Sequence, residues 1–198
     1  FDLHEDANLS SSAETATEPG ASEDEDAAEA AAVGAAMDAL VARLRGEGFK
    51  TIVEARKFLS ELTGQPITDA DLKYVDEIIE TAVVAAARDI AGEGNDPART
   101  FADLVDLYRK QPKLGTRTST SVAQQAYSTP APLAFLASRL AGVTSETSVY
   151  EPSAGNGMLL IEASPRNTHA VELNPYRAAA LQAMGFNPVV GDAMSDAT

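Results

Sequence analysis

The sequence predicts a mixed α+β and α/β fold, in which an N-terminal helical domain precedes a truncated Rossmann-like half with parallel strands. Residues 27–111 hold four segments whose apolar side chains recur at helical spacing, separated by short Gly or Pro breaks. Residues 129–198 alternate short apolar runs with small-residue loops in the order β-α-β-α-β. That order requires parallel strands joined by right-handed crossovers.

The composition of the 198 residues excludes several classes of protein. Cysteine is absent, which excludes disulfides and thiolate zinc sites, and two histidines are too few for a histidine-rich metal site. No apolar run is long enough to cross a bilayer, so we expect no membrane association. Of the formal net charge of −15, most falls on residues 1–30, which hold ten acids and no Lys or Arg. We expect residues 1–26 to be a disordered acidic tail, with an acidic interaction arm as the alternative.

Capping signals divide residues 27–111 into four helices. Gly46 ends the first helix, and Thr51 with Glu54 forms a capping box at the start of the second. Thr68 is the expected cap of the third helix, and Asp96-Pro97 begins the fourth. The side chains expected to face the core share helical spacing: Val33, Met37, Leu40, Val41 and Leu44; Ala55, Phe58, Leu59 and Leu62; Leu72, Val75, Ile79, Ala82 and Ala86; Phe101, Leu104, Val105 and Tyr108.

A polar linker over residues 112–128 follows, and basic side chains gather at its start. Arg109, Lys110, Lys113 and Arg117 make the only basic concentration in the sequence. Lys and Arg contact nucleic-acid phosphates without reading the base sequence, so DNA contact is one hypothesis for this cluster. A solvated surface is the alternative.

The last region, residues 129–198, opens with a capped helix. Thr129 is the expected N-cap and Pro130 the first helical residue. The buried face of this helix is expected to consist of Leu133, Leu136, Ala137 and Leu140. After it we expect a strand at 148–151, a short helix at 157–163, a strand at 169–173, a helix at 175–184 and a strand at 188–192.

A loop of small residues joins the first of these strands to the helix after it. It reads Glu151-Pro152-Ser153-Ala154-Gly155-Asn156-Gly157, and glycines at such a turn let the backbone approach a ligand closely. Glu172 ends the next strand, 21 positions after Glu151, where a carboxylate can accept hydrogen bonds from ribose hydroxyls. Asp192 ends the third strand, so we expect the three carboxylates to border one nucleotide-binding cleft. Glu151 and Asp192 have an alternative role as caps of neighbouring helices.

These residues resemble the successive cofactor motifs of N6-adenine DNA methyltransferases, which use S-adenosylmethionine. The resemblance rests on Thr129-Pro130, residues 151–157, Glu172-Leu173-Asn174 and Gly191-Asp192. The stretch from residues 114–120 through 125–130 into Met158-Leu159-Leu160 is similar to a narrower group. These are large phage and mobile-element proteins that fuse such a methyltransferase to a strawberry-notch-like superfamily 2 helicase. Some members of that group are antirestriction proteins carried inside the virion. The resemblance therefore implies a location in a prokaryotic cytoplasm or in a phage particle.

The resemblance implies roles for the residues around the methionine part of the cofactor. Thr129 and Pro130 would lie beside that part, and Glu151 would interact with its amino group, directly or through water. The backbone of Ser153, Ala154, Gly155, Asn156 and Gly157, which follows Pro152, would pass beneath the ligand.

It implies further roles at the nucleoside end. Glu172 would accept from both ribose hydroxyls, Leu173 would pack on the adenine face, and Asp192 would accept from the adenine N6 amine. Carboxylates suit a ligand that presents cationic groups and hydroxyl donors better than a lysine-bearing phosphate loop would.

The sequence departs from the family at the catalytic motif. The Asn/Asp/Ser-Pro-Pro-aromatic segment that holds the flipped target base does not occur in these 198 residues. We therefore expect a cofactor half-site without a catalytic residue, and no DNA methylation by this chain alone. Such a half leaves an unpaired strand edge, which further residues of the same polypeptide or a partner protein would cover, and DNA would bind only to the complete protein.

Two other functions remain as alternatives. The first is a non-catalytic interaction or virion structural module that uses a methyltransferase-like scaffold. The second is a fragment of a Rossmann dehydrogenase, whose Gly-x-Gly-x-x-Gly fingerprint lacks its third glycine after Gly155-Asn156-Gly157.

Overall fold

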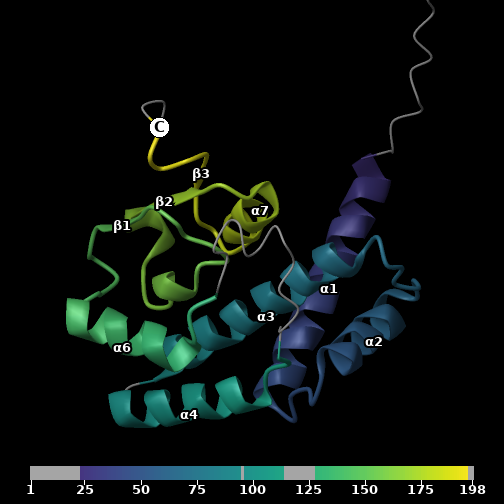
Figure 1. The fold of residues 1–198 in the computed structure, drawn as a ribbon, viewed down its shortest axis with the longest axis horizontal. Coiled ribbons are helices and arrows are strands. Elements are labelled where there is room, and N and C mark those ends of the chain that lie inside the picture. The colour runs from purple at the N-terminus through teal and green to yellow at the C-terminus, as the bar shows by residue number, and fades with distance from the viewer. Residues whose placement is uncertain (1–22, 95, 114–127, 196–198) are drawn as a thin grey trace, which may run out of the picture.

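The structure, a computed structural model, describes residues 23–94, 96–113 and 128–195 (Figure 1). Most of the expected tail, residues 1–22, and the linker residues 114–127 with Arg117 lie outside the described residues. Helix α1 (Glu23–Arg45) begins inside the segment that was expected to be disordered, so that expectation is wrong for residues 23–26.

Three further helices follow α1 in the N-terminal region: α2 (Ile52–Thr63), α3 (Leu72–Glu93) and α4 (Pro97–Lys110). The predicted cap of α2 is confirmed, because the Thr51 hydroxyl accepts a hydrogen bond from the Glu54 amide at 3.1 Å. The predicted start of α4 is also confirmed, since the Asp96 carboxylate accepts from the Ala98 amide at 3.0 Å.

The predicted cap of α3 is wrong. Asp71, not Thr68, occupies the N-cap position. Thr68 lies in the preceding turn, where its amide and its hydroxyl both donate to the Asp71 carboxylate, at 2.9 and 2.7 Å. These bonds lower the pKa of Asp71, the side-chain bond contributing most. Both residues favour local side-chain bonds, so the sequence offers two caps and does not decide between them.

Four side chains that were predicted to face the core are exposed: Val33, Leu62, Phe101 and Tyr108. In α4 the buried residues are Thr100, Leu104 and Leu107, so the buried face is rotated by one position from the predicted one. A helix rich in apolar residues carries two overlapping stripes at 3.6 spacing, and its neighbours determine which stripe is buried.

The C-terminal region contains a parallel sheet of three strands. Strands β1 (Val149–Glu151), β2 (Thr168–Glu172) and β3 (Val189–Val190) lie in the order β1-β2-β3, with both neighbouring pairs parallel. Helix α6 (Ala131–Ala141) precedes the sheet, and α7 (Pro175–Ala183) connects β2 to β3. Helices and parallel strands together confirm a mixed α and β fold.

The helix expected at 157–163 is replaced by a single 3₁₀ turn, η1 (Met158–Leu160). The amides of Leu160 and Ala163 donate to carbonyls three residues earlier, at 3.0 Å in both cases. A second 3₁₀ turn, η2 (Pro165–Asn167), begins soon afterwards. Because Pro165 has no amide hydrogen, a longer helix could not continue through it.

Helix α6 turns its leucines outward, contrary to the prediction. Leu133, Leu136 and Leu140 are 56%, 46% and 80% exposed, and Ala137 is also exposed. The buried residues of α6 are small or aromatic: Ala131, Pro132, Ala134, Phe135 and Ser138. The start also differs, because Pro130 occupies the N-cap position that was predicted for Thr129. Small residues allow α6 to lie close to α4 and to η1, which it contacts most.

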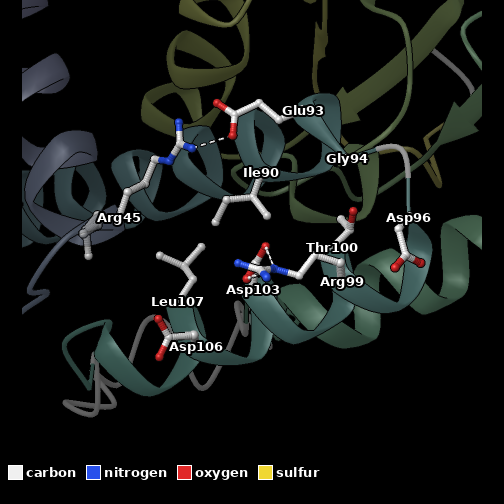
Figure 2. A pocket seen from close by; sticks show the side chains of 11 residues that line it. Arg45, Ile90, Glu93, Gly94, Asp96, Arg99, Thr100, Asp103, Asp106 and Leu107 are labelled. Atoms are coloured by element: carbon white, nitrogen blue, oxygen red, sulfur yellow. Dashed lines mark hydrogen bonds and ion pairs between the residues drawn. The ribbon is translucent and has the colours of Figure 1, made fainter.

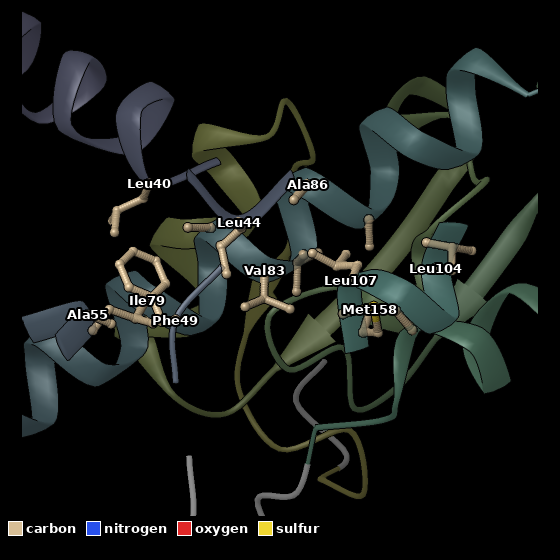
Figure 3. Close-up of a cluster of buried hydrophobic side chains, with 14 of the residues drawn as sticks. Leu40, Leu44, Phe49, Ala55, Ile79, Val83, Ala86, Leu104, Leu107 and Met158 are labelled. Carbon is tan, nitrogen blue, oxygen red and sulfur yellow. The ribbon is translucent and has the colours of Figure 1, made fainter. Parts of the chain in front are cut away.

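One apolar core joins the helices to the α/β region. It contains residues of α1, α2, α3 and α4 together with Phe135 of α6 and Met158 of η1 (Figure 3). A smaller cluster that includes Leu160, Leu181 and Phe186 lies around the sheet. In Figure 1, α3 runs through the middle of the molecule, with α4 on one side and the sheet and α7 on the other.

Arg88 of α3 links these two clusters. Its guanidinium donates to the carbonyls of Leu160 and Ala163, the latter at 3.2 Å, and lies 4.8 Å from the centre of the Phe186 ring. Burial lowers the pKa of Arg88, against the charge of Asp89, which raises it.

Candidate functional site

The three predicted carboxylates lie at the same edge of the sheet. Glu151 and Glu172 are the last residues of β1 and β2, and Asp192 follows β3 by two positions. The strands are parallel, so their carboxyl ends share one edge, as the sequence predicted. The Gly191 amide donates to the Glu172 carbonyl at 3.0 Å, which keeps the turn before Asp192 against the end of β2.

The glycine loop of residues 152–157 crosses this edge. The Ala154 amide donates to the Val171 carbonyl at 3.0 Å, which ties the loop to β2. Gly155 and Gly157 have φ angles of 56° and 86°, which side-chain-bearing residues rarely adopt. A Cβ atom on Gly155 would meet no atom within 4 Å, whereas one on Gly157 would lie 2.8 Å from Leu181 Cδ2. Gly157 therefore allows the loop to pack on α7, and Gly155 leaves an open face.

Glu172 fastens the loop to the sheet. Its Oε2 accepts from the Gly155 amide at 2.6 Å, and its Oε1 accepts from the Asn174 amide at 2.8 Å. The residue is buried, with 8% of its surface exposed. Each carboxylate oxygen can accept two hydrogen bonds, so both oxygens keep capacity for a hydroxyl donor.

Within the described residues, no helix begins directly after Glu151 or Asp192, and each acid accepts hydrogen bonds in the turn that follows it. Glu151 Oε1 accepts from the amide and the hydroxyl of Ser153, at 3.1 and 3.2 Å. Asp192 Oδ1 accepts from the Met194 amide at 2.9 Å. Each acid orders the turn that follows its own strand and keeps a second carboxylate oxygen for another donor.

The other predicted residues lie next to these elements. Thr129 and Pro130 are half-buried immediately before α6, and Pro152 is exposed at the start of the loop. Leu173 is 54% exposed directly after Glu172, so an apolar surface is accessible beside that carboxylate. Carboxylates at three strand ends, an open glycine face and an accessible leucine therefore lie near one another, and hydroxyl or cationic donors are the groups that such carboxylates accept from.

Sequence reasoning missed a polar cluster that lies under the loop. Asn156, which is 4% exposed, donates from Nδ2 to Glu77 Oε2 at 3.1 Å and to Glu80 Oε2 at 3.0 Å. Arg177 of α7 donates to the same carboxylates, with Nε 3.0 Å from Glu77 Oε2 and the terminal nitrogen 3.4 Å from Glu80 Oε2. The Ser128 hydroxyl also donates to Glu80.

Burial affects the protonation of this cluster. It raises the pKa of the Glu80 carboxyl, although the Ser128 bond and the charge of Arg177 oppose that change. Burial works against the charge of Arg177 as well, but the hydrogen bond to Glu77 and the charges of Glu77, Glu80 and Glu172 outweigh it and raise the pKa of Arg177.

A signal for this cluster exists in the sequence. From Ile78 to Ala87, α3 is apolar apart from Glu80 and Thr81, and Arg88 follows directly after this run. Charged residues inside an apolar helix segment need partners, because an unpaired charge is rarely buried. The sequence alone does not identify those partners, because the partners of Glu80 lie between 48 and 97 residues away along the chain.

The basic cluster predicted for DNA contact is only partly described. Arg109 and Lys113 are exposed, Lys110 forms an ion pair with Asp106, and Arg117 lies outside the described residues. Nothing in this arrangement tests DNA contact, which stays a prediction.

A pocket of about 520 Å³ lies between α1, α3 and α4 and not at the glycine loop (Figure 2). Its charged lining residues pair with one another: Arg45 lies 2.6 Å from Glu93, and Arg99 lies 2.9 Å from Asp103. The pairing with Glu93, led by its hydrogen bond, raises the pKa of Arg45. The first ion pair joins α1 to α3 and the second joins successive turns of α4, so both contribute to the packing of the helices.

Within the described ranges, no group of three or more His, Cys, Asp and Glu side chains could hold a metal ion. None of the helices there is both long and apolar enough to span a bilayer. Comparisons with protein families, with characterised proteins and with solved structures give no match to this chain.

Proposed function

We propose that the glycine loop and the three strand ends form the S-adenosylmethionine-binding half of a Rossmann-like DNA adenine-N6 methyltransferase. The observation that carries the proposal is the placement of Glu151, Glu172 and Asp192 at one sheet edge, beside a loop that Glu172 itself fastens. S-adenosylmethionine supplies the methyl group as a sulfonium when it is bound. The chain's own residues bind and orient it.

Each carboxylate has a separate part in this proposal. Glu172 accepts from the ribose hydroxyls with the acceptor capacity that the Gly155 and Asn174 amides leave. Glu151 faces the amino end of the ligand, and Asp192 accepts from the adenine N6 amine. Leu173 packs on the adenine face. Together these acids place negative charge where a cationic ligand lies, which favours it over a neutral analogue.

The proposal gives this chain cofactor binding and assigns methyl transfer to the complete protein. The chain holds no Asn/Asp/Ser-Pro-Pro-aromatic segment to position a target adenine. DNA is then a partner of the complete protein, and protection of phage DNA against restriction is the purpose that the family resemblance suggests.

Calorimetry with S-adenosylmethionine and with its demethylated product tests the proposal. The chain should bind both ligands, Glu172→Ala should abolish binding, and NAD should not bind. Glu93→Gln is the matched control, because it alters an exposed carboxylate of α3 whose ion-pair partner among the described residues is Arg45. Absence of binding of both ligands to the unsubstituted chain would refute the proposal, and binding of NAD alone would favour a dehydrogenase fragment.

A second function has one observation in its favour, the outward leucine stripe of α6. Leu133, Leu136 and Leu140 follow helical spacing and are all exposed, as the face of an interaction module would be. Under this alternative the chain binds a protein partner and no nucleoside ligand. The same calorimetric experiment separates the two functions.

A further inference from the structure

Asn156 joins the glycine loop to helix α3, which belongs to the helical part of the chain. We propose that Glu77 and Glu80 of α3 are positioning residues, which hold Asn156 and with it the glycine loop in the conformation that binds the ligand. The proposal deepens the proposed function and rests on it for the identity of the ligand. It makes the helical layer a structural requirement of the cofactor site.

Glu77 and Glu80 fix the orientation of the Asn156 side-chain amide. Both carboxylates accept from Asn156 Nδ2, at 3.1 and 3.0 Å. A rotated amide would point Oδ1 at two carboxylates, which repel it, so Glu77 and Glu80 determine the orientation of this side chain. Oδ1 is buried and has no hydrogen-bond partner among the described residues. The two hydrogen bonds at Nδ2 offset the free-energy cost of leaving Oδ1 without a partner.

Asn156 holds the glycine loop at a point where the backbone would otherwise be flexible. It stands between Gly155 and Gly157, two residues with positive φ whose backbone would otherwise sample many conformations. Glu172 of β2 holds the Gly155 amide from the sheet, and the α3 carboxylates hold Asn156 from the helical layer. The loop is therefore fixed at consecutive residues by two separate elements.

Arg177 allows two carboxylates to lie together under the loop. It bonds to both and is only 9% exposed, and the charge of Glu172 also acts on it. Without Arg177, the two partly buried carboxylates would repel each other. The ion pairs thus hold the Glu77 and Glu80 side chains in place under the loop, directed at Asn156.

The test uses three variants of the 198-residue chain and S-adenosylhomocysteine as the calorimetric probe. These are Asn156→Ala, the double variant Glu77→Gln with Glu80→Gln, and the combination of all three substitutions. Asn156→Ala should weaken binding about tenfold, the effect of losing a buried hydrogen bond to a charged group. The combined variant should bind no more weakly than the double variant, since Asn156 has already lost its carboxylate partners there. Glu93→Gln, also on α3, should bind as the unsubstituted chain does.

Hydrogen exchange at the loop amides separates this proposal from the proposed function. The Gly155 and Gly157 amides should exchange about tenfold faster in Asn156→Ala and in the double variant, and unchanged in Glu93→Gln. If the unsubstituted chain binds no ligand but these amides respond, the proposed function fails and the positioning role stands. If binding is intact in Asn156→Ala, or the loop amides exchange at the same rate, the positioning role is refuted.

Discussion

The two glycines of the loop serve different purposes at the scale of single residues, although both have positive φ. Gly155 faces open space and Gly157 faces Leu181 of α7. A ligand can therefore approach the first, whereas the second allows the loop and the helix to lie in contact. The same division of purpose between glycines would hold for any ligand that binds this edge.

Alanine at each position should separate these purposes. Gly155→Ala should lower the free energy of unfolding by about 1 kcal/mol, the cost of a left-handed backbone. Gly157→Ala should cost about 2–4 kcal/mol, because its Cβ would also lie 2.8 Å from Leu181 Cδ2. Urea unfolding of both variants measures the difference. Equal losses would show that the contact with Leu181 is relieved without cost.

Glu80 is the residue from which we expect a pH effect. Its pKa is raised in the folded protein by burial, against Ser128 and Arg177, while Glu77 and Asp76 raise it further. Between the ordinary pKa of a glutamate, about 4.3, and this raised value, the folded chain binds more protons than the unfolded chain. The contribution of Glu80 to stability is thus complete below the ordinary pKa and is lost as the pH rises through the raised one.

Glu80→Gln should remove this pH dependence. Its stability relative to the unsubstituted chain should increase as the pH rises from about 4.3 through the raised pKa, and should be constant at lower pH. Urea unfolding of both proteins over a pH series measures this difference. A difference that is independent of pH would show that the carboxyl of Glu80 titrates normally.

At the scale of elements, the sequence predicts boundaries better than it predicts buried faces. The starts of α2 and α4 were predictable because Thr51 and Asp96 cap locally, with bonds that involve only nearby residues. The faces of α4 and α6 were not, because Phe101 and Leu136 have the apolarity of core residues and only the neighbouring elements leave them exposed. The parallel strand ends were predictable from residue order, but the contact of Asn156 with α3 depends on residues far away in sequence.

Two leucines in these helices test which faces are buried. Leu104 of α4 is fully buried and Leu140 of α6 is 80% exposed. Leu104→Ala should lower the free energy of unfolding by about 2–5 kcal/mol, through lost burial and the cavity left behind. Leu140→Ala should change it by no more than about 0.5 kcal/mol. Thermal or urea unfolding measures the free energy of unfolding of both variants. A large decrease for Leu140→Ala would show that Leu140 makes a contact outside the described residues.

At the scale of the whole molecule, the helical part and the α/β part share one core. Leu40, Ile79 and Leu104 belong to the same cluster as Phe135 and Met158. Arg88 and the Glu77–Glu80 pair add polar contacts across the same boundary. A three-stranded sheet of this size has little stability by itself, so the sheet depends on α3 for its position.

The chain should therefore unfold in one cooperative transition. Far-ultraviolet circular dichroism follows mainly the helices, and hydrogen exchange at the loop amides follows the α/β part. The two probes should give the same urea midpoint. Two separate midpoints, with the α/β part lost first, would show that the shared core does not couple the regions.

The order β1-β2-β3 leaves the outer sides of β1 and β3 without a strand among the described residues. The bonds that form the candidate site use carboxylate side chains and loop amides, and the side of β1 that faces away from β2 contributes nothing to them. A strand added there would widen the sheet and leave the carboxyl-end turns as they are. Sheet growth and ligand contact are therefore independent properties of this scaffold, and each could change in evolution or in design without the other.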